Sequence, residues 1–209
     1  MDKETGIVRD TYSHLGSVYD DWAETVREDE RQKYLTKISQ RFHNGAKILD
    51  IGCGNGLLNT LYMANHFDVI GIDISERQIA EAKRNVPSVE FICTDIRDFI
   101  VDPDSLDGIV SFYCFNHIPR ATYGALFAKF HRWLKINGLF IASFGIGDTE
   151  YWTGEWLGVT TFFSSYNEEE TISLIERKGF GIEERTVETA LENEIEISFL
   201  WIIARKTKL

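Results

Sequence analysis

The strongest indication of the fold is Ile48-Leu49-Asp50-Ile51-Gly52-Cys53-Gly54-Asn55-Gly56. A short apolar run that begins at Lys47 passes into three glycines at alternate positions, and apolar residues then recur at helical spacing. This pattern predicts a buried parallel strand, a tight turn and the start of a helix. Glycines in such a turn permit positive φ or the close approach of another molecule. Because open α/β sheets bind ligands at the carboxyl ends of their strands, the stretch predicts a nucleotide-like ligand at this turn.

The composition indicates a single folded domain with an acidic surface. The 209 residues are 44% hydrophobic and 13% aromatic, which suffices for one substantial core and argues against extended disorder. A formal net charge of -11 makes nucleic acid an unlikely partner, because a broad grip on its phosphates needs basic side chains. Ten glutamates between Glu168 and Glu196 are typical of a solvated, solubilising face.

The sequence carries no signal for a membrane, secreted or metal-binding protein. It has no apolar run of the ~20 residues that span a bilayer, and the polar start Met1-Asp2-Lys3-Glu4 does not resemble a signal peptide. The cysteines at positions 53, 93 and 114 lack a zinc spacing and are expected to be reduced packing thiols. We therefore expect a cytoplasmic protein without a bound metal or a membrane partner.

Residues 1–44 are predicted to form helices ahead of the first strand. Apolar residues recur there at three- and four-residue spacing, and a second helix is expected near Thr25 to Phe42. No linker separates the region from residues 45–209, so the two are expected to form one structural unit. The region could only cap the sheet edge, or it could cover a ligand with polar-tipped rings such as Tyr12 and Tyr19.

From Lys47 onward the chain is predicted to alternate strands and helices, which implies a parallel sheet with right-handed crossovers. The expected strands are 47–51, 68–73, 89–93, 108–112, 139–144, 180–188 and 195–205. The expected helices are 57–65, 76–85, 121–134 and 168–178, with Asn137-Gly138 marking the end of the third. The last two strands have no helix between them and should form an antiparallel hairpin. The expected fold class is α/β, a Rossmann-like three-layer αβα sandwich around a seven-stranded, mostly parallel sheet.

Two acids follow neighbouring strands beside the glycine turn. Asp73 ends the second strand, where a carboxylate can accept both hydroxyls of a ribose. The alternative role for this position is a helix N-cap, for which Ser75, with Gln78 three residues on, is the better candidate. Asp95 follows the third strand and can accept a hydrogen bond from an adenine amine, while Ile96 packs against the base.

Together these stretches resemble the class I S-adenosylmethionine-dependent methyltransferases, over about residues 45 to 145. The matching stretches are 49–56, 71–73, 94–95, 107–111 and 134–139, with a mild departure at Ile136-Asn137-Gly138. The resemblance implies S-adenosylmethionine as cofactor and S-adenosylhomocysteine as product. The residues that it implies for cofactor binding, with their neighbours in the motifs and the N-terminal rings, are Asp50, Gly52, Cys53, Gly54, Gly56, Asp73, Ile74, Asp95, Ile96, Ser111, Phe112, Tyr12 and Tyr19. A nicotinamide dehydrogenase shares the strand–glycine–helix start, but Leu57 stands where its fingerprint needs a third glycine.

Methyl transfer needs a base only when the acceptor must lose a proton. His117 lies just past the fourth strand, where an imidazole could take that proton, although it could equally cap a helix or be a surface residue. The Asn-Pro-Pro-Tyr signature of enzymes that act on amide or exocyclic amine nitrogens is absent after the fourth strand. DNA adenine and protein glutamine are therefore disfavoured as substrates.

The acceptor is expected to be recognised by residues 147–166, a segment rich in aromatic side chains and acids. Trp152 and Trp156 in this segment and Tyr113 after the fourth strand are the candidate substrate contacts. Alternatively, the segment is a hydrophobic cover that serves only stability. The sequence predicts methyl transfer to O or N of a small-molecule acceptor. RNA or protein methylation, or a non-catalytic cofactor-binding module, are the alternatives.

Overall fold

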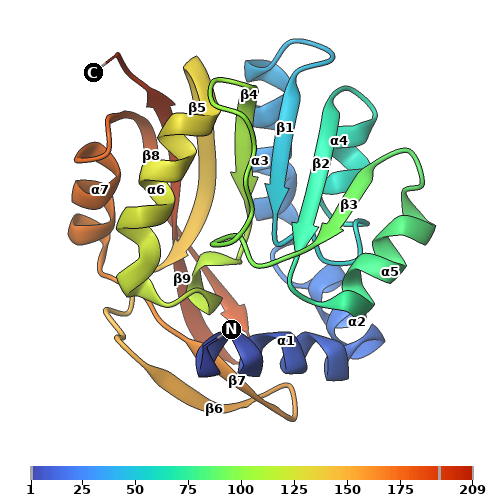
Figure 1. The fold of residues 1–209 in the computed structure, drawn as a ribbon. Helices are drawn as coiled ribbons and strands as arrows, with labels where there is room; N and C mark the ends of the chain where they lie inside the picture. Colours follow the sequence, from blue (N-terminus) through green and yellow to red (C-terminus); the bar gives the residue numbers. More distant parts are fainter. Residues whose placement is uncertain (1, 193, 209) are drawn as a thin grey trace.

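The computed structural model describes residues 2–192 and 194–208, and its centre is one seven-stranded sheet (Figure 1). Its strands are β1 (Lys47–Ile51), β2 (Asp68–Asp73), β3 (Glu90–Cys93), β4 (Leu106–Ser111), β5 (Leu134–Gly145), β8 (Phe180–Glu192) and β9 (Ile195–Lys206). The helices are α1 (Lys3–Leu15), α2 (Ser17–Thr25), α3 (Glu28–Arg41), α4 (Thr60–Ala64), α5 (Glu76–Asn85), α6 (Tyr123–Trp133) and α7 (Glu168–Glu176). Two short 3-10 turns, Phe115–His117 and Arg120–Thr122, follow β4.

The order of the strands confirms the predicted Rossmann-like sheet. It is β3-β2-β1-β4-β5-β9-β8, in which β1 pairs in parallel with both β2 and β4. β9 runs antiparallel to β5 and to β8, as expected for a terminal hairpin. Because β1, β2 and β4 are parallel, their carboxyl ends meet at one edge of the sheet, and the strand order reverses beside β1, where such folds bind ligands.

Helices cover both faces of the sheet. Because alternate residues of a buried strand point to opposite faces, each strand contributes side chains to both cores. In β1, Leu49 joins the core under α6 and α7, whereas Ile48 joins the core under α3 and α4. α6 contributes a row of buried aromatic side chains, and Tyr34 of α3 stacks on Trp201 of β9 with ring centroids 3.7 Å apart. These two cores fix the strand ends that carry the site.

Two local predictions were wrong, each for an identifiable reason. The helix after the glycine turn begins at Thr60 instead of residue 57, because the Asn55 side chain accepts from the Leu57 N–H and holds a turn there. Asn137-Gly138 does not end a helix. It lies inside β5, where Asn137 has φ 67° and the register against β4 shifts in a bulge. Segment 147–166 contains two strands that were not predicted, β6 (Trp152–Trp156) and β7 (Val159–Phe163), which pair as a hairpin.

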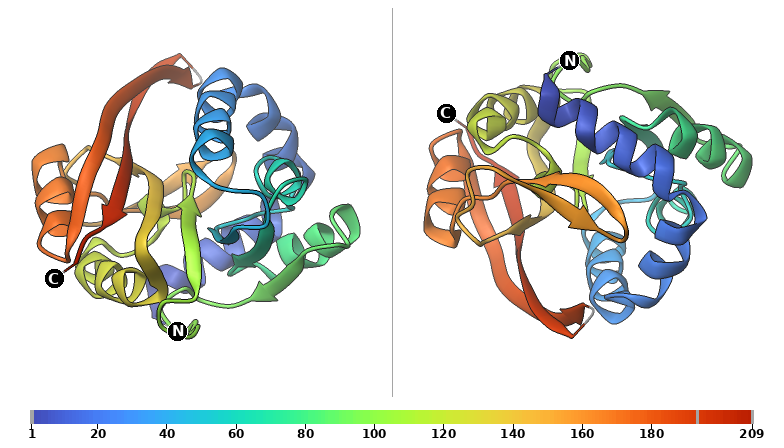
Figure 2. Two further views of the ribbon diagram at one scale, coloured as in Figure 1. Left: turned by 90° about the horizontal axis from the view of Figure 1, so that it is seen from above. Right: turned by 90° about the horizontal axis from the view of Figure 1, so that it is seen from below.

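Helices α1 and α2 and the β6–β7 hairpin lie together over the carboxyl edge of the sheet (Figures 1 and 2). The chain bends at Gly16, which has φ 49°, so residues 1–44 form three helices instead of the expected two. Thr11 of α1 lies with its Oγ1 2.8 Å from the carbonyl oxygen of Thr160 in β7. Among the residues that the structure describes, no helix is long and apolar enough to cross a bilayer.

Candidate active site

Two adjoining cavities open between the carboxyl edge of the sheet and the segments that cover it. The smaller has a volume of about 770 Å³, including space open to solvent, and extends over the ends of β2 and β3. The larger has a volume of about 1720 Å³ by the same measure and is lined by residues of α2, the β6–β7 hairpin and the β8–β9 hairpin. Both are lined by the same seven residues, which we call the waist: Tyr12, Tyr19, Gly52, Gly54, Phe112, Tyr113 and His117.

The glycine turn forms the floor of the waist. Gly52 and Gly54 have φ of 74° and 56°, in the left-handed region that glycine adopts without strain. A Cβ on Gly52 would lie 2.7 Å from the Cys114 side chain, so close packing excludes any larger residue there. A Cβ on Gly54 would meet nothing nearer than Gln78 Oε1 at 3.7 Å, so this backbone is open to a neighbour from the cavity.

Asp73 lies in the smaller cavity beside the glycine turn. Its two carboxylate oxygens accept from the Gly54 N–H at 3.0 Å and the Ser75 N–H at 2.9 Å. Burial raises the pKa of Asp73, while these two backbone donors act against the rise. Ser75 caps α5 by accepting from the Gln78 N–H, as predicted. Ser75, and not Asp73, is therefore the N-cap of α5, and Asp73 lines the smaller cavity.

Asp95 also lines the smaller cavity, but its carboxylate is already engaged. It accepts three N–H groups of Arg97, from the backbone, Nε and a terminal guanidinium nitrogen. The same guanidinium contacts Asp2 and the Thr5 hydroxyl at the start of α1. This ion-pair cluster attaches the N-terminal helix to the loop after β3.

A hydrogen-bond chain crosses the waist. Tyr12 Oη lies 2.8 Å from His117 Nε2, and His117 Nδ1 lies 3.1 Å from the carbonyl oxygen of Phe162 in β7. Burial lowers the pKa of His117 to about 4, so the ring is neutral near pH 7. Its candidacy as a base is weakened both by this pKa and by the engagement of Nε2.

Aromatic rings from distant segments form one wall of the larger cavity. Trp156 of β6 packs edge-on against Trp22 at a centroid distance of 5.2 Å and lies 6.1 Å from Tyr19 and 6.3 Å from Tyr12. Segment 147–166 thus packs on the N-terminal helices through Trp156. Trp152, in contrast, stacks on Phe163 and is 40% exposed.

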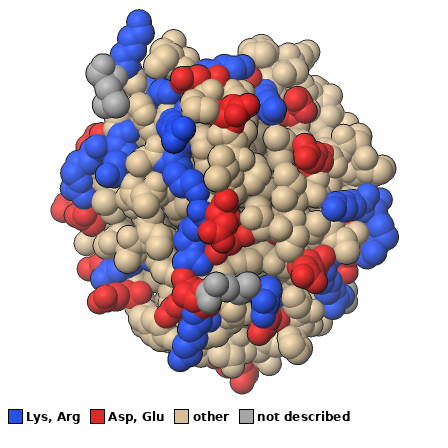
Figure 3. All heavy atoms as spheres, viewed as in Figure 1, with Lys and Arg blue, Asp and Glu red and all other residues tan. Residues whose placement is uncertain are grey.

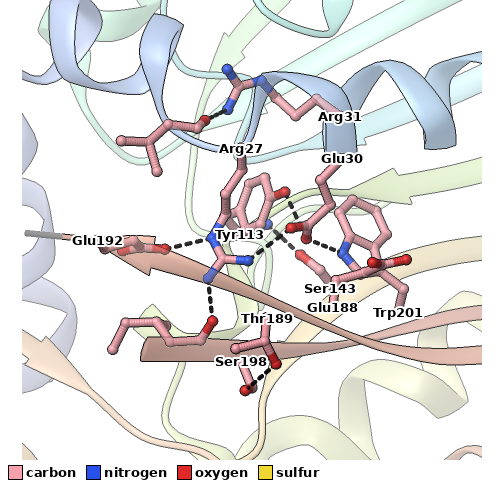
Figure 4. A network of polar contacts seen from close by, with 12 residues as sticks. Arg27, Glu30, Arg31, Tyr113, Ser143, Glu188, Thr189, Glu192, Ser198 and Trp201 are labelled. Atoms are coloured by element: carbon pink, nitrogen blue, oxygen red, sulfur yellow. Dashed lines mark hydrogen bonds and ion pairs between the residues drawn. The ribbon is translucent and has the colours of Figure 1, made fainter. Parts of the chain in front are cut away.

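A buried polar network supports the opposite wall (Figure 4). Arg27, at the start of α3, donates to Glu30, to Glu192 of β8 and to the carbonyl oxygen of Ile197 in β9. Glu30 also accepts from Tyr113 Oη at 3.0 Å and from the Trp201 indole. The network ties the β8–β9 hairpin, which extends beyond the end of β5, to the N-terminal helices.

The structure brings most of the predicted site residues to the cavities. The predicted residues that line only the smaller cavity are Asp73, Ile74, Asp95 and Ile96. Cys53 and Trp156 line only the larger one, and every waist residue had been predicted.

Four predicted residues, Asp50, Gly56, Ser111 and Trp152, line neither cavity. The Asp50 carboxylate is fully buried and accepts from Thr60 Oγ1, and burial raises its pKa to about 7. The Ser111 hydroxyl is buried and donates to the carbonyl oxygen of Ile51. Gly56 packs on the α5 side, and Trp152 faces outward.

Arg27, Arg31 and Glu192 line the larger cavity and had not been predicted to do so. The stretch Arg27-Glu28-Asp29-Glu30-Arg31 has the composition of a solvated helix start, and Glu192 lies in an acidic run. Only the Arg27–Glu30 spacing of three residues, which places both side chains on one helix face, offered a signal.

Comparison with known proteins defines the class of this fold and site. Residues 48–138 match the model of a family described as "Methyltransferase domain". The chain is similar to the cyclopropane-fatty-acyl-phospholipid synthase of Escherichia coli (strain K12), at 32% identity over 142 residues that cover 65% of this chain and 36% of that protein. It is similar to the ubiquinone biosynthesis O-methyltransferase of Nitrobacter winogradskyi, at 30% identity over 68% of this chain and 59% of that protein. The chain thus spans between about a third and three-fifths of the length of these relatives.

The solved structures agree on the fold. Magnesium protoporphyrin IX methyltransferase from Synechocystis PCC 6803, with bound SAM, superposes with a TM-score of 0.74 at 16% identity, over 99% of each chain. The chain belongs to the class I S-adenosylmethionine-dependent methyltransferase family.

The residues present fit an adenosyl ligand such as S-adenosylmethionine. The Gly54 backbone is open on its cavity side, and the Asp73 carboxylate lies beside it. Ile74 and Ile96 supply apolar surface in the same cavity, as a flat base requires.

Proposed function

We propose that the protein transfers a methyl group from S-adenosylmethionine to O or N of a small-molecule acceptor. The observation that carries this proposal is the junction of two cavities directly over the glycine turn. A donor in the smaller cavity and an acceptor in the larger one would meet at the waist. Methyl transfer gains much of its acceleration from holding its two reactants in line, worth roughly 7–11 kcal/mol in favourable cases.

The donor side consists of the residues that line the smaller cavity and the waist. Gly52 and Gly54 would face the methionine and ribose portions, Asp73 would accept the ribose hydroxyls, and Ile74 and Ile96 would flank the adenine. Asp95 would bind the adenine amine with the acceptor capacity that remains beside Arg97, since a carboxylate offers about four lone-pair sites.

The acceptor side is the larger cavity. Its lining, drawn from helices and two hairpins, favours a small molecule over a polymer. On the face shown in Figure 3, basic and acidic side chains are interspersed instead of forming one broad basic area. Both observations weigh against the alternative of RNA methylation.

When bound, the donor supplies an activated methyl group on a sulfonium. The waist would exclude water from the reacting groups. It would also place aromatic faces near the positive charge, a cation–π interaction worth about 0.5–2 kcal/mol. Tyr12 and Tyr19 of α1 and α2 provide these faces, so residues 1–44 would act as a lid on the domain formed by 45–209.

Calorimetry with S-adenosylmethionine and S-adenosylhomocysteine tests the proposal. Gly54→Ala would obstruct the floor of the waist, and Gly45→Ala is its matched control, because Gly45 also has positive φ but lies in open space. We expect both ligands to bind the wild type and Gly45→Ala, and to bind Gly54→Ala much more weakly. A wild type that binds neither ligand would remove the proposal, and binding without transfer to any acceptor would favour a non-catalytic module.

A further inference from the structure

We propose that the acceptor's nucleophile is a weakly basic N–H nitrogen that hydrogen-bonds to Tyr12 Oη, and that the protein removes no proton from it before methyl transfer. This inference rests on the proposed function and narrows its acceptor to one chemical class. Arylamines are the simplest members of that class.

The tautomer of His117 fixes the direction of the Tyr12 hydrogen bond. The carbonyl oxygen of Phe162 can only accept, so His117 Nδ1 carries the proton in that contact. In the neutral ring Nε2 is then bare, and the Tyr12 hydroxyl donates to it. Tyr12 therefore has no proton left to donate to a ligand. Its oxygen also interacts with the Tyr19 hydroxyl, which leaves one lone pair to accept a hydrogen bond at the waist.

Tyr113 is committed in the same way. Its hydroxyl donates to Glu30 Oε1 at 3.0 Å, within the buried network of Figure 4. Tyr113 has φ 55°, an unusual value for a bulky residue, and its own N–H donates to Ser143 Oγ at 2.7 Å. Tyr12 and Tyr113 thus have no hydroxyl proton to offer a ligand, which suits a ligand that donates and disfavours a carboxylate at this point.

The carboxylates that line the cavities offer no free base at the waist. Asp73 and Asp95 line only the smaller cavity, where the donor would occupy them, and Glu192 is paired with Arg27. Glu196, the remaining lining carboxylate among the described residues, lies exposed near the start of β9 and is not a waist residue. His117 has its lone pair engaged by Tyr12.

Without a base, the nucleophile must attack with its proton still attached. The nitrogen lone pair forms the new N–C bond while the C–S bond breaks toward sulfur, so the positive charge passes to nitrogen, and the ammonium later loses a proton to water. A hydroxyl that attacked in this way would give a far less stable oxonium. A strongly basic amine would enter protonated and without a lone pair, which is why a weakly basic nitrogen fits best.

Binding of two probes of similar shape tests the hydrogen bond without catalysis. Aniline and toluene would be titrated into the protein saturated with S-adenosylhomocysteine, with calorimetry as readout. We expect Tyr12→Phe to lower the ratio of aniline to toluene affinity by about 2- to 10-fold, the loss of one net hydrogen bond. Tyr62→Phe, on α4 and outside both cavities, should leave the ratio unchanged.

The outcomes separate the inference from the function on which it rests. Absence of S-adenosylhomocysteine binding would refute the proposed function itself. Binding of that ligand with an unchanged probe ratio in Tyr12→Phe, or benzoate binding more tightly than aniline in the wild type, would overturn the inference alone. So would a labelled methyl group found on oxygen in a reaction product.

Discussion

At the scale of single residues, Asp73 shows how one side chain serves both the fold and the site. Its carboxylate joins the end of β2 to the glycine turn by accepting from the Gly54 N–H. The same carboxylate lines the smaller cavity, and burial there raises its pKa. A buried charge held in this way is costly unless a ligand uses it.

We predict that Asp73→Ala weakens binding of S-adenosylhomocysteine by about 1.5–3 kcal/mol, the range for hydrogen bonds to charged groups. Calorimetry would measure this change. Asp68→Ala, at the exposed opposite end of β2, is the control and should bind as the wild type does. Unaltered affinity in Asp73→Ala would mean that this carboxylate does not hold the donor.

His117 makes a prediction for stability against pH. Burial lowers its pKa from 6.5 to about 4, so between these values the unfolded chain binds a proton that the folded protein does not. The free energy of unfolding therefore falls as the pH drops through this window. We expect the wild type to lose about 2 kcal/mol more than His117→Gln between about pH 7 and pH 5, measured by urea unfolding. Parallel losses in the two proteins would contradict the shift.

At the scale of elements, Arg27 attaches the long β8–β9 hairpin to the N-terminal helices. The Arg27 side chain is 2% exposed and lies between Glu30 and Glu192, at 9% and 14%. Removing one member of such a group leaves buried charges without a partner.

We predict that Arg27→Met lowers the free energy of unfolding by about 3–5 kcal/mol. Lys33→Met, which breaks the more exposed pair with Glu188 on the same hairpin, should cost only about 0–1 kcal/mol. Chemical denaturation of both variants checks the comparison, and equal losses would show that the Arg27 network does not anchor the hairpin.

How far the elements could be predicted depended on how local their causes were. The strands at 47–51 and 68–73 follow from their apolar runs and were found at the predicted residues. The β6–β7 hairpin was missed because Gly154 and the Leu157-Gly158 turn interrupt any simple alternation. Asn137-Gly138 has the composition of a helix end, but Leu134 and Leu139 on either side pair with β4, so the dipeptide lies in a bulge within a strand.

The site shows the same limit. The glycine turn and Asp73 could be predicted because each follows a strand in a recognisable pattern. The hydrogen bond between Tyr12 and His117 joins residues 105 positions apart, and Arg27 meets Glu192 across 165 positions. Such contacts depend on the packing of the lid and the hairpins, which no local pattern encodes.

At the scale of the whole molecule, the segments outside the parallel strands enclose the site together. α1 contacts the loop after β3 through Asp2 and Arg97, the β6–β7 hairpin through Thr11, and the waist through Tyr12. A ligand in the smaller cavity would therefore bind beneath α1 as well as against the sheet.

We predict that S-adenosylhomocysteine slows amide hydrogen exchange in α1, because binding stabilises the closed arrangement. Mass spectrometry of peptides covering Lys3–Leu15 would detect this, and α7 at Glu168–Glu176, which contributes nothing to either cavity, is the internal control. Unchanged exchange in α1, with binding established, would contradict a covering role for residues 1–44.

Transfer of an isotopically labelled methyl group is the most direct test of methyl transfer to a small acceptor. The protein would be incubated with methyl-labelled S-adenosylmethionine and a small-molecule extract of its own source cells, and the products separated by mass spectrometry. The two-cavity site predicts a labelled product of low molecular mass with the wild type and little or none with Asp73→Ala. A label that stays on the donor, or moves only to protein or RNA, would contradict it.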